Sequence, residues 1–276
     1  MSPQSPTATD LLHRRYGADQ GAKIERHNET VEAMLSHRSV RSYLPDPVPE
    51  DLLQLAIAAA QSAPTSSSLQ AWSVVAVEDE EKRRRLEQLA SPNPQIVSAP
   101  LFLVWIADLS RLRIISQSNG RSGEGLDYLE SFLVASIDAT LAAQNALVAF
   151  ESFGLGTCYI GGMRNHPSEV AELLGLPPES MAVFGMTVGY PDPAIKTAVK
   201  PRLPQSLVLH REHYRSGAVE RDFDGYDETM RAFQSAQDMA VRGWTKVVAN
   251  RIGEAQSLHG RHLLSAIMRR MGFKIR

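Results

Sequence analysis

The sequence predicts a mixed β-sheet with helices packed on both of its faces. Two observations support this fold class. Short apolar segments rich in valine, isoleucine and aromatic residues have strand character, and the longer segments between them carry apolar residues at helical spacing. Strands that alternate with helices along a chain form a layered sheet-and-helix fold. The predicted strands cover residues 72–77, 101–107, 157–160 and 181–190.

The helices are predicted from their start and stop signals. Pro49 is followed by two acidic residues, and this order suits the first turn of a helix. Glycines directly after the long apolar segment 128–153 end the helix predicted there. Residues 108–126 contain several glycines and are predicted to form a loop, a candidate mobile lid. The other predicted helices cover residues 28–36, 50–60, 78–90, 167–174, 226–239, 244–253 and 257–272.

Three regions are expected along the chain. Residues 1–26 are polar and contain prolines, so they are predicted to form an N-terminal arm or poorly ordered tail. Residues 27–210 hold all predicted strands and are expected to form the core. Residues 211–276 have too few apolar residues for a core of their own, so they are expected to form a helical extension that packs on the core or on a partner subunit.

Composition restricts the function. The chain of 276 residues has a formal net charge of −2, so the molecule as a whole lacks a field that attracts polyanions, and we expect no nucleic-acid partner. Its one cysteine, Cys158, allows no intramolecular disulfide and no cysteine-based zinc site, which suits a reducing compartment. We expect this thiol to be packed and unreactive.

A soluble, cytoplasmic location is expected for the same chain. The N-terminal residues lack an apolar core of signal-peptide length. The longest apolar stretch, residues 132–153, is interrupted by acidic and amide side chains that are costly in lipid. It is therefore predicted to be a buried helix and not a membrane span.

Several common catalytic motifs are absent from the sequence. No glycine fingerprint of a dinucleotide-binding fold follows a predicted strand, and no Walker A loop, G-x-S-x-G elbow or H-E-x-x-H helix is present. These absences disfavour dinucleotide-binding, P-loop, hydrolase and zinc-protease functions.

Basic segments and flexible turns remain as the pattern that carries chemistry. Arg38 and Arg41 are three positions apart, so a turning backbone can direct both toward one phosphate, which arginine binds in a bidentate manner. A second basic segment, Lys-Pro-Arg at 200–202, is stiffened by its proline. The hydroxyl-rich loop 65–68 and the glycine pair 161–162 offer hydroxyl and backbone N–H donors. Each feature alone is typical of an exposed turn, but together they suit a mononucleotide with a conjugated ring.

Taken in order, these segments make the chain similar to the nitroreductase superfamily of FMN enzymes. Within it, the chain resembles the NfsA/FRP-type group of NAD(P)H-dependent flavin oxidoreductases. The matching segments are residues 37–53, 63–75, 146–177, 183–191 and 200–210. The resemblance implies an α+β fold with a central mixed sheet flanked by helices, and an obligate homodimer with FMN bound at the dimer interface.

The resemblance also implies which residues bind tightly held FMN. Thr65 stands where the family has serine and Asn93 where it commonly has glutamine, and both retain the hydroxyl or amide group. No side chain is expected to act as a catalytic nucleophile, and no metal is expected, because the flavin carries the chemistry. The residues carried over are His37, Arg38, Ser39, Arg41, Thr65, Asn93, Tyr159, Ile160, Gly161, Gly162, Lys200 and Arg202.

The implied activity is reduction of nitroaromatics, quinones or free flavin by ping-pong hydride transfer. NADPH-selective members present arginines in a tail loop, whereas residues 235–242 contain one arginine, Arg242, so NADPH and NADH both stay open as co-substrate. Two alternatives remain. One is another flavin reaction on the same scaffold, either reductive dehalogenation or flavin breakdown. The other is a non-enzymatic anion-binding or nucleic-acid-binding module that uses basic residues such as those at 83–85.

Overall fold

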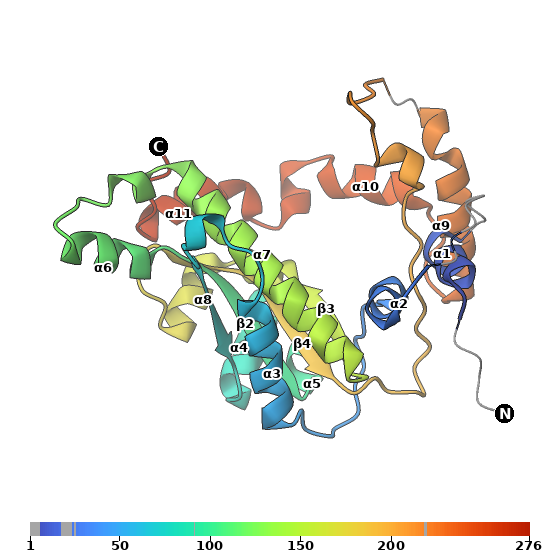
Figure 1. Ribbon diagram of the computed structural model, residues 1–276, viewed down its shortest axis with the longest axis horizontal. Helices are drawn as coiled ribbons and strands as arrows, with labels where there is room; N and C mark the ends of the chain where they lie inside the picture. Colours follow the sequence, from blue (N-terminus) through green and yellow to red (C-terminus); the bar gives the residue numbers. More distant parts are fainter. Residues whose placement is uncertain (1–5, 18–23, 25, 91, 218–219) are drawn as a thin grey trace. The chain divides into compact units, whose positions relative to one another are not determined.

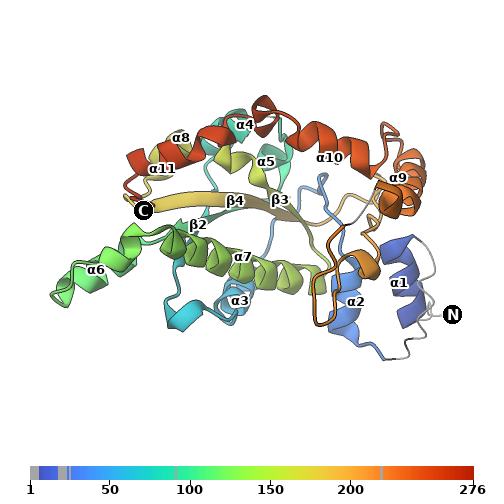
Figure 2. The same cartoon turned by 90° about the horizontal axis from the view of Figure 1, so that it is seen from above.

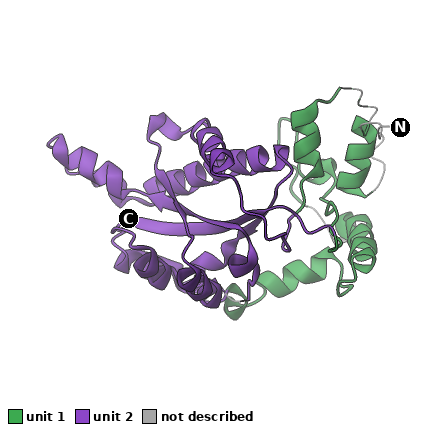
Figure 3. Ribbon diagram, turned by 90° about the horizontal axis from the view of Figure 1, so that it is seen from below, with its two compact units in different colours: residues 1–38, 194–258 green, residues 39–193, 259–276 purple. Residues whose placement is uncertain are grey.

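Figure 1 shows the computed structural model of the chain, which describes residues 6–17, 24, 26–90, 92–217 and 220–276. The chain forms two compact units, which Figure 3 colours separately. Unit 1 consists of residues 1–38 and 194–258, and unit 2 consists of residues 39–193 and 259–276. Each unit therefore combines segments that are distant in the sequence.

Unit 2 is built on a sheet with the strand order β1-β2-β4-β3. The strands are β1 (Trp72–Ala76), β2 (Leu101–Asp108), β3 (Gly156–Ile160) and β4 (Ser180–Gly189). Every pairing between these strands is antiparallel, so the prediction of a mixed sheet is wrong for them. The helical connection from β1 to β2 leaves and re-enters at the same end of the sheet, which pairs Ala76 with Leu103. Helices between strands do not by themselves demand a parallel crossover.

Helices cover both faces of this sheet, as predicted (Figure 2). On one face lie α3 (Glu50–Gln61) and α7 (Leu129–Ser152), and on the other lie α4 (Glu80–Ala90), α5 (Gln95–Ser98) and α8 (Pro167–Leu174). Strand β2 serves both sides: Leu103 and Trp105 belong to the core under α3 and α7, whereas Phe102 and Val104 belong to the core under α4 and α8. All residues of β2 are buried, so the strand requires both layers of cover.

Helix α7 is the central helix of unit 2. By length and composition alone it is apolar enough to cross a membrane. Its buried face instead packs on α3 and the sheet through Ala142, Ala146 and Phe150. Asp138 lies on the same buried side and accepts hydrogen bonds from protein donors. These contacts are those of a helix that packs in the core of unit 2.

Unit 1 is helical in the part of the chain that the structure describes. Its α-helices are α1 (Ala8–Tyr16), α2 (Glu29–Ser36), α9 (Asp224–Ala236) and α10 (Trp244–Ile252). Helix α1 starts at a capping box between Thr7 and Asp10 and ends at Gly17, whose φ is 68°. A stretch of the N-terminal arm is therefore a capped helix, while residues 1–5, 18–23 and 25 lie outside the described residues. Short 3₁₀ turns in this unit cover Gln205–Leu207, Glu220–Phe223 and Ala255–Leu258.

The prediction of a loop over residues 108–126 is wrong. This segment contains helix α6 (Ser110–Ser118), followed by a 3₁₀ turn at Glu124–Asp127. The helix exposes two neighbouring isoleucines, Ile114 and Ile115, so its sequence lacks the apolar stripe from which helices are predicted. The last helix of unit 2, α11 (Leu264–Arg270), precedes the C-terminus. Other 3₁₀ turns cover Ser66–Ser68, Gly161–Arg164 and Arg261–Leu263.

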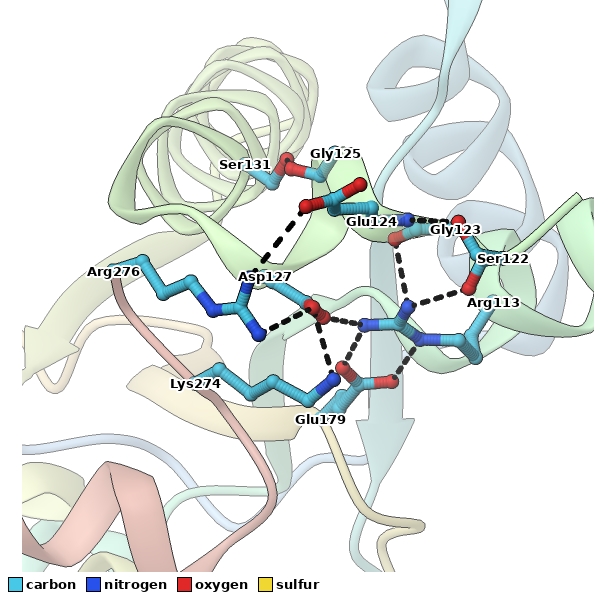
Figure 4. Close-up of polar contacts among 10 residues, drawn as sticks. All are labelled: Arg113, Ser122, Gly123, Glu124, Gly125, Asp127, Ser131, Glu179, Lys274 and Arg276. Carbon is cyan, nitrogen blue, oxygen red and sulfur yellow. Dashed lines mark hydrogen bonds and ion pairs between the residues drawn. The ribbon is translucent and has the colours of Figure 1, made fainter.

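A network of ion pairs fixes the base of α6 (Figure 4). Arg113 donates from Nη2 to Asp127 Oδ1 at 2.7 Å and to Glu179 Oε1 at 2.6 Å, and its Nη1 donates to the carbonyl oxygen of Gly123 at 2.7 Å. Lys274 Nζ donates to Asp127 Oδ2 at 2.9 Å. These contacts join α6 to the start of β4 and to the C-terminal segment. The base of the helix is therefore anchored, which a freely mobile lid would not be.

The carboxylate of Asp127 gives this network a pH dependence. Hydrogen bonds from Lys274 and then from Arg113 hold the pKa of Asp127 below its usual range. A depressed carboxylate pKa stabilises the folded state above the unfolded pKa of about 3.9, and the stabilisation is lost as the pH falls through the lower, folded pKa. We predict that Asp127→Asn lowers the melting temperature at pH 7 and at pH 5 by the same amount. The difference from wild type should then shrink below about pH 4, where the carboxylate of the unfolded wild-type chain takes up its proton before that of the folded chain does.

Thermal melts of both proteins between pH 3 and pH 7 test this. Glu124→Gln is the matched control, because Glu124 is exposed and its contact with Arg276 is 3.5 Å long, so little change is expected. A difference in melting temperature between wild type and Asp127→Asn that stays constant down to pH 3 would contradict the stabilising role assigned to the Asp127 carboxylate.

Candidate functional site

Arg15 joins the two basic segments of unit 1. Its Nη2 donates to the carbonyl oxygens of Leu35 at 2.6 Å and His37 at 2.8 Å, and its Nη1 donates to that of Lys200 at 3.3 Å. The backbone oxygen of Arg15 accepts from the N–H of Arg202 at 3.0 Å. Two motifs that are more than 150 residues apart along the chain are thereby held at one guanidinium.

Other contacts fix the backbone and side chains around these motifs. The Tyr226 hydroxyl donates to the carbonyl oxygen of Pro201 at 3.0 Å, and burial raises the pKa of Tyr226. Arg38 Nε donates to Thr197 Oγ1 at 3.0 Å, and Arg202 Nη1 donates to the carbonyl oxygen of Lys200 at 3.0 Å. Three of the predicted residues, Arg38, Lys200 and Arg202, therefore belong to one assembly with His37, and we name these three the cation group of unit 1.

Ser39 and Arg41 lie along strand β3 in unit 2. Ser39 forms a parallel bridge with Thr157, and the N–H of Val40 donates to the carbonyl oxygen of Thr157 at 2.9 Å. Val40 is buried, so its two neighbours take the opposite side of this extended segment. Burial raises the pKa of the Cys158 thiol, opposed by the charge of Arg41 and by a hydrogen bond with Ser39. The expected packed cysteine is confirmed.

Gly161 and Gly162 form a tight corner at the end of β3. A Cβ on Gly162 would lie 2.6 Å from the carbonyl oxygen of Ala90, at the end of α4, so only glycine permits this close approach. The same oxygen accepts from Asn93 Nδ2 at 2.8 Å and from Asn165 Nδ2 at 3.3 Å. Asn93, predicted from the resemblance, therefore lies beside the glycine pair. We name the group of Ala90, Asn93, Gly161 and Gly162 the glycine corner.

Two arginines that the sequence analysis did not select lie at the glycine corner. A Cβ on Gly161 would have the Nη2 of Arg164 at 3.4 Å and the Nη1 of Arg261 at 3.8 Å as its nearest neighbours. Arg261 Nε also donates to Asn165 Oδ1 at 2.9 Å, and Arg164 Nη1 donates to the carbonyl oxygen of Val183. Arg164 directly follows the glycine turn in the sequence, which was an available signal. Arg261 comes from the C-terminal tail, where no sequence pattern marked it.

Tyr159 and Ile160 lead into the glycine corner from β3. The ring of Tyr159 meets Phe184 edge to face with ring centroids 4.9 Å apart, and its hydroxyl donates to Gln144 Oε1 at 3.5 Å. Burial raises the pKa of Tyr159, so its hydroxyl stays protonated at neutral pH. Ile160 is buried in the core under α4 and α8. Both residues set the direction of the strand as it enters the glycine pair.

Thr65 is anchored to α7. Its hydroxyl donates to Asp138 Oδ2 at 2.6 Å, and the N–H of Ala71 donates to the same oxygen at 3.0 Å. Between these two residues, Ser67 and Ser68 have φ angles of 48° and 55°, a left-handed conformation that is strained for residues with side chains. Asp138 thus holds the predicted hydroxyl-rich loop in a fixed, strained shape, with the Thr65 hydroxyl turned toward α7.

Comparisons with known proteins identify this arrangement. The model of the nitroreductase family matches residues 34–190, and the model of the nitroreductase C-terminal domain matches residues 200–276. The chain belongs to the nitroreductase family. The matched residues contain the whole cation group and the whole glycine corner of this nitroreductase, but not helix α1 with Arg15.

Individual relatives match this nitroreductase over most of its length and over most of their own. The NADPH-flavin oxidoreductase of Vibrio harveyi is 38% identical over 232 residues, which cover 83% of this chain and 93% of the relative. The FMN reductase [NAD(P)H] of Bacillus subtilis is 36% identical over 252 residues, 90% of this chain and 99% of the relative. The structure of the Vibrio harveyi NADPH:FMN oxidoreductase complexed with NAD+ superposes with a TM-score of 0.80 at 36% identity, covering 90% of this chain and all of that one.

Proposed function

We propose that this nitroreductase is an FMN-dependent NAD(P)H oxidoreductase that reduces a small-molecule acceptor in a ping-pong cycle. The observation that carries the proposal is that the backbone segments bearing Arg38, Lys200 and Arg202, which are distant in the sequence, are all bound to Arg15 in unit 1. A cluster of arginine and lysine side chains suits a dianionic phosphate. A cytoplasmic location and a small-molecule partner agree with this chemistry.

The residues present fit the phosphate end of FMN. The backbone of the Lys200–Arg202 segment is fixed at each residue, by Arg15 at both ends and by Tyr226 in the middle. Because this backbone is already fixed in the folded protein, little backbone entropy is lost when its side chains bind an anion. We assign phosphate binding to the cation group, and we keep Arg41, which belongs to the same sequence motif as Arg38, as a further proposed phosphate contact.

The glycine corner fits the ring end of FMN. Its glycines leave the backbone without Cβ atoms, which permits close approach to a planar ring. The guanidinium groups of Arg164 and Arg261 lie beside Gly161, where positive charge would stabilise the negative charge of a reduced flavin. We therefore add Arg164 and Arg261 to the residues proposed to face the ring or the acceptor.

FMN, when bound, would supply the two-electron redox chemistry between a reduced nicotinamide and the acceptor. The chain itself supplies positioning and charge: the cation group holds the phosphate, the glycine corner admits the ring, and Arg164 and Arg261 provide the local positive field. Nitroaromatics, quinones and free flavin are the proposed acceptors. Free flavin is favoured by the names of the Vibrio and Bacillus relatives, and a nitroaromatic by the family to which the chain belongs.

Removing two of the proposed arginines together tests the proposed phosphate contacts. We predict that Arg41→Ala combined with Arg202→Ala yields a folded protein that has lost most of its FMN. Each charge-assisted hydrogen bond to the phosphate contributes about 1.5–3 kcal/mol, so losing two weakens FMN binding by about 100-fold or more. FMN content per chain is measured from flavin absorbance after gel filtration, and folding from circular dichroism.

The matched control is Arg85→Ala combined with Arg211→Ala, which also removes one exposed arginine from each unit. This control should keep its full FMN content. A folded Arg41→Ala, Arg202→Ala protein with stoichiometric FMN would refute the proposed site.

We further propose that two copies of the chain associate through α7. Leu133, Ile137 and Leu141 are four residues apart and therefore share one face of the helix. They are 46%, 56% and 38% exposed, although the opposite face of α7 is fully packed. A continuous apolar stripe of this kind on the longest helix is typical of a protein–protein interface.

A charge in the middle of this stripe should prevent association. We predict that Ile137→Glu converts a dimer into a monomer at micromolar concentration, because the carboxylate would have to be buried without a partner. Light scattering coupled to size-exclusion chromatography measures the mass. Ile137→Val keeps the stripe apolar and should remain dimeric, and an Ile137→Glu protein that elutes as a dimer would contradict the assignment.

A further inference from the structure

We infer that Arg15 is a positioning residue for the FMN phosphate, and that α1, which carries Arg15, therefore contributes to cofactor binding. The inference rests on the proposed function, since it assumes that the cation group binds the phosphate. Helix α1 precedes the residues that the family model matches, so the contribution of Arg15 lies outside them.

The first step is the position of the Arg15 guanidinium. Arg15 is only 8% exposed, although arginine is seldom buried unless its donors are satisfied. Its terminal nitrogens donate to carbonyl oxygens of Leu35 and His37, at the end of α2, and of Lys200. The last carbonyls of a helix lack partners within the helix and carry partial negative charge, so a buried cation there is stabilised. Arg15 thus caps the C-terminal end of α2 and at the same time binds the segment that contains Lys200.

The second step is what this attachment fixes. Arg38 directly follows one carbonyl held by Arg15, and Lys200 carries another. The N–H of Arg202 donates to the backbone oxygen of Arg15. All three members of the cation group are thus at most one residue from an atom that Arg15 binds. The planar guanidinium sets the separation of the two segments, and thereby the separation of the charges that they carry.

The third step concerns α1, which is itself held in place. Gly17 ends the helix against α9, where a Cβ would lie 2.4 Å from Thr229 Cγ2 and 3.6 Å from Pro201 Cγ. Gln205 Nε2 donates to the Tyr16 hydroxyl at 3.1 Å. The neighbours of Arg15 thus pack on the segment that contains the late basic motif. This makes α1 a stable base for the guanidinium.

The prediction separates phosphate binding from binding of the rest of the cofactor. FMN and riboflavin differ only in the phosphate, so the ratio of their dissociation constants reports the phosphate site alone. We predict that Arg15→Met raises the dissociation constant of FMN by about 10- to 100-fold, by analogy with the loss of affinity when a partner that orients a metal-binding side chain is removed. The dissociation constant of riboflavin should change by less than about threefold. Both are measured by flavin fluorescence with the full-length, flavin-depleted chain.

Three further variants make the experiment decisive. Arg14→Met removes a neighbouring exposed arginine from α1 and should leave both constants unchanged. Arg15→Lys keeps the charge but replaces the planar fork by a single ammonium group, so the FMN constant should rise by a smaller factor, and this variant decides the question if Arg15→Met does not fold. Arg202→Ala removes a proposed direct contact with the phosphate, so it should weaken the binding of FMN more than the binding of riboflavin.

The outcomes distinguish the two levels of the proposal. A selective loss of FMN binding in the Arg15 variants supports the inference. Equal losses for FMN and riboflavin would overturn it, because Arg15 would then be needed only for folding. The inference would also be overturned if the ratio of the riboflavin to the FMN dissociation constant stayed at its wild-type value in the Arg15 variants but fell in Arg202→Ala. The proposed phosphate site would then remain intact. An unchanged ratio in all variants would refute the phosphate site itself.

Discussion

Burial of β2 on both of its faces is the constraint on which unit 2 depends. A strand whose residues are all buried needs a partner strand on each side and an apolar layer above and below. Helices α3 and α7 supply one layer, and α4 and α8 supply the other. The second layer brings the end of α4 against the end of β3, and this contact forms the glycine corner. The geometry proposed to admit the flavin ring is thus a consequence of how the sheet is covered.

Unit 1 differs in that it holds together the backbone segments that carry several positive charges. Like charges repel, so the backbone that carries them must be fixed by other interactions. Here the fixing groups are the Arg15 guanidinium and the Tyr226 hydroxyl, which bind backbone carbonyls. Positive charge prepared in this way is preorganised for an anion, and binding then costs less conformational entropy.

Local pattern in the sequence was enough to predict most helices and strands. The long helix was predicted at 128–153 and spans Leu129–Ser152, because its small and apolar residues recur at helical spacing up to a glycine. The directions of the strands could not be predicted, since a helical connection is compatible with either direction. Helix α6 was missed because its exposed isoleucines break the amphipathic pattern, and its position depends on the distant partners of Arg113.

Some residues of the proposed site can be recognised from the sequence and others cannot, for a related reason. Arginines next to helix ends and glycine pairs after strands are visible in a sequence, and they led to the cation group and the glycine corner. Arg15 and Arg261 were missed because they act on groups that are far away in the chain. Arg15 binds backbone carbonyls, which every residue possesses, and Arg261 binds Asn165, 96 residues away. Neither contact leaves a pattern in neighbouring residues.

The most direct test of the account is the visible absorption of the purified protein under anaerobic conditions. The account predicts a yellow protein with a flavin band from one FMN per chain. Addition of NADPH or NADH should bleach this band, and a nitroaromatic or quinone should then restore it. A folded protein that neither carries FMN nor takes it up, or a flavin band that reduced nicotinamide leaves unchanged, would contradict the account.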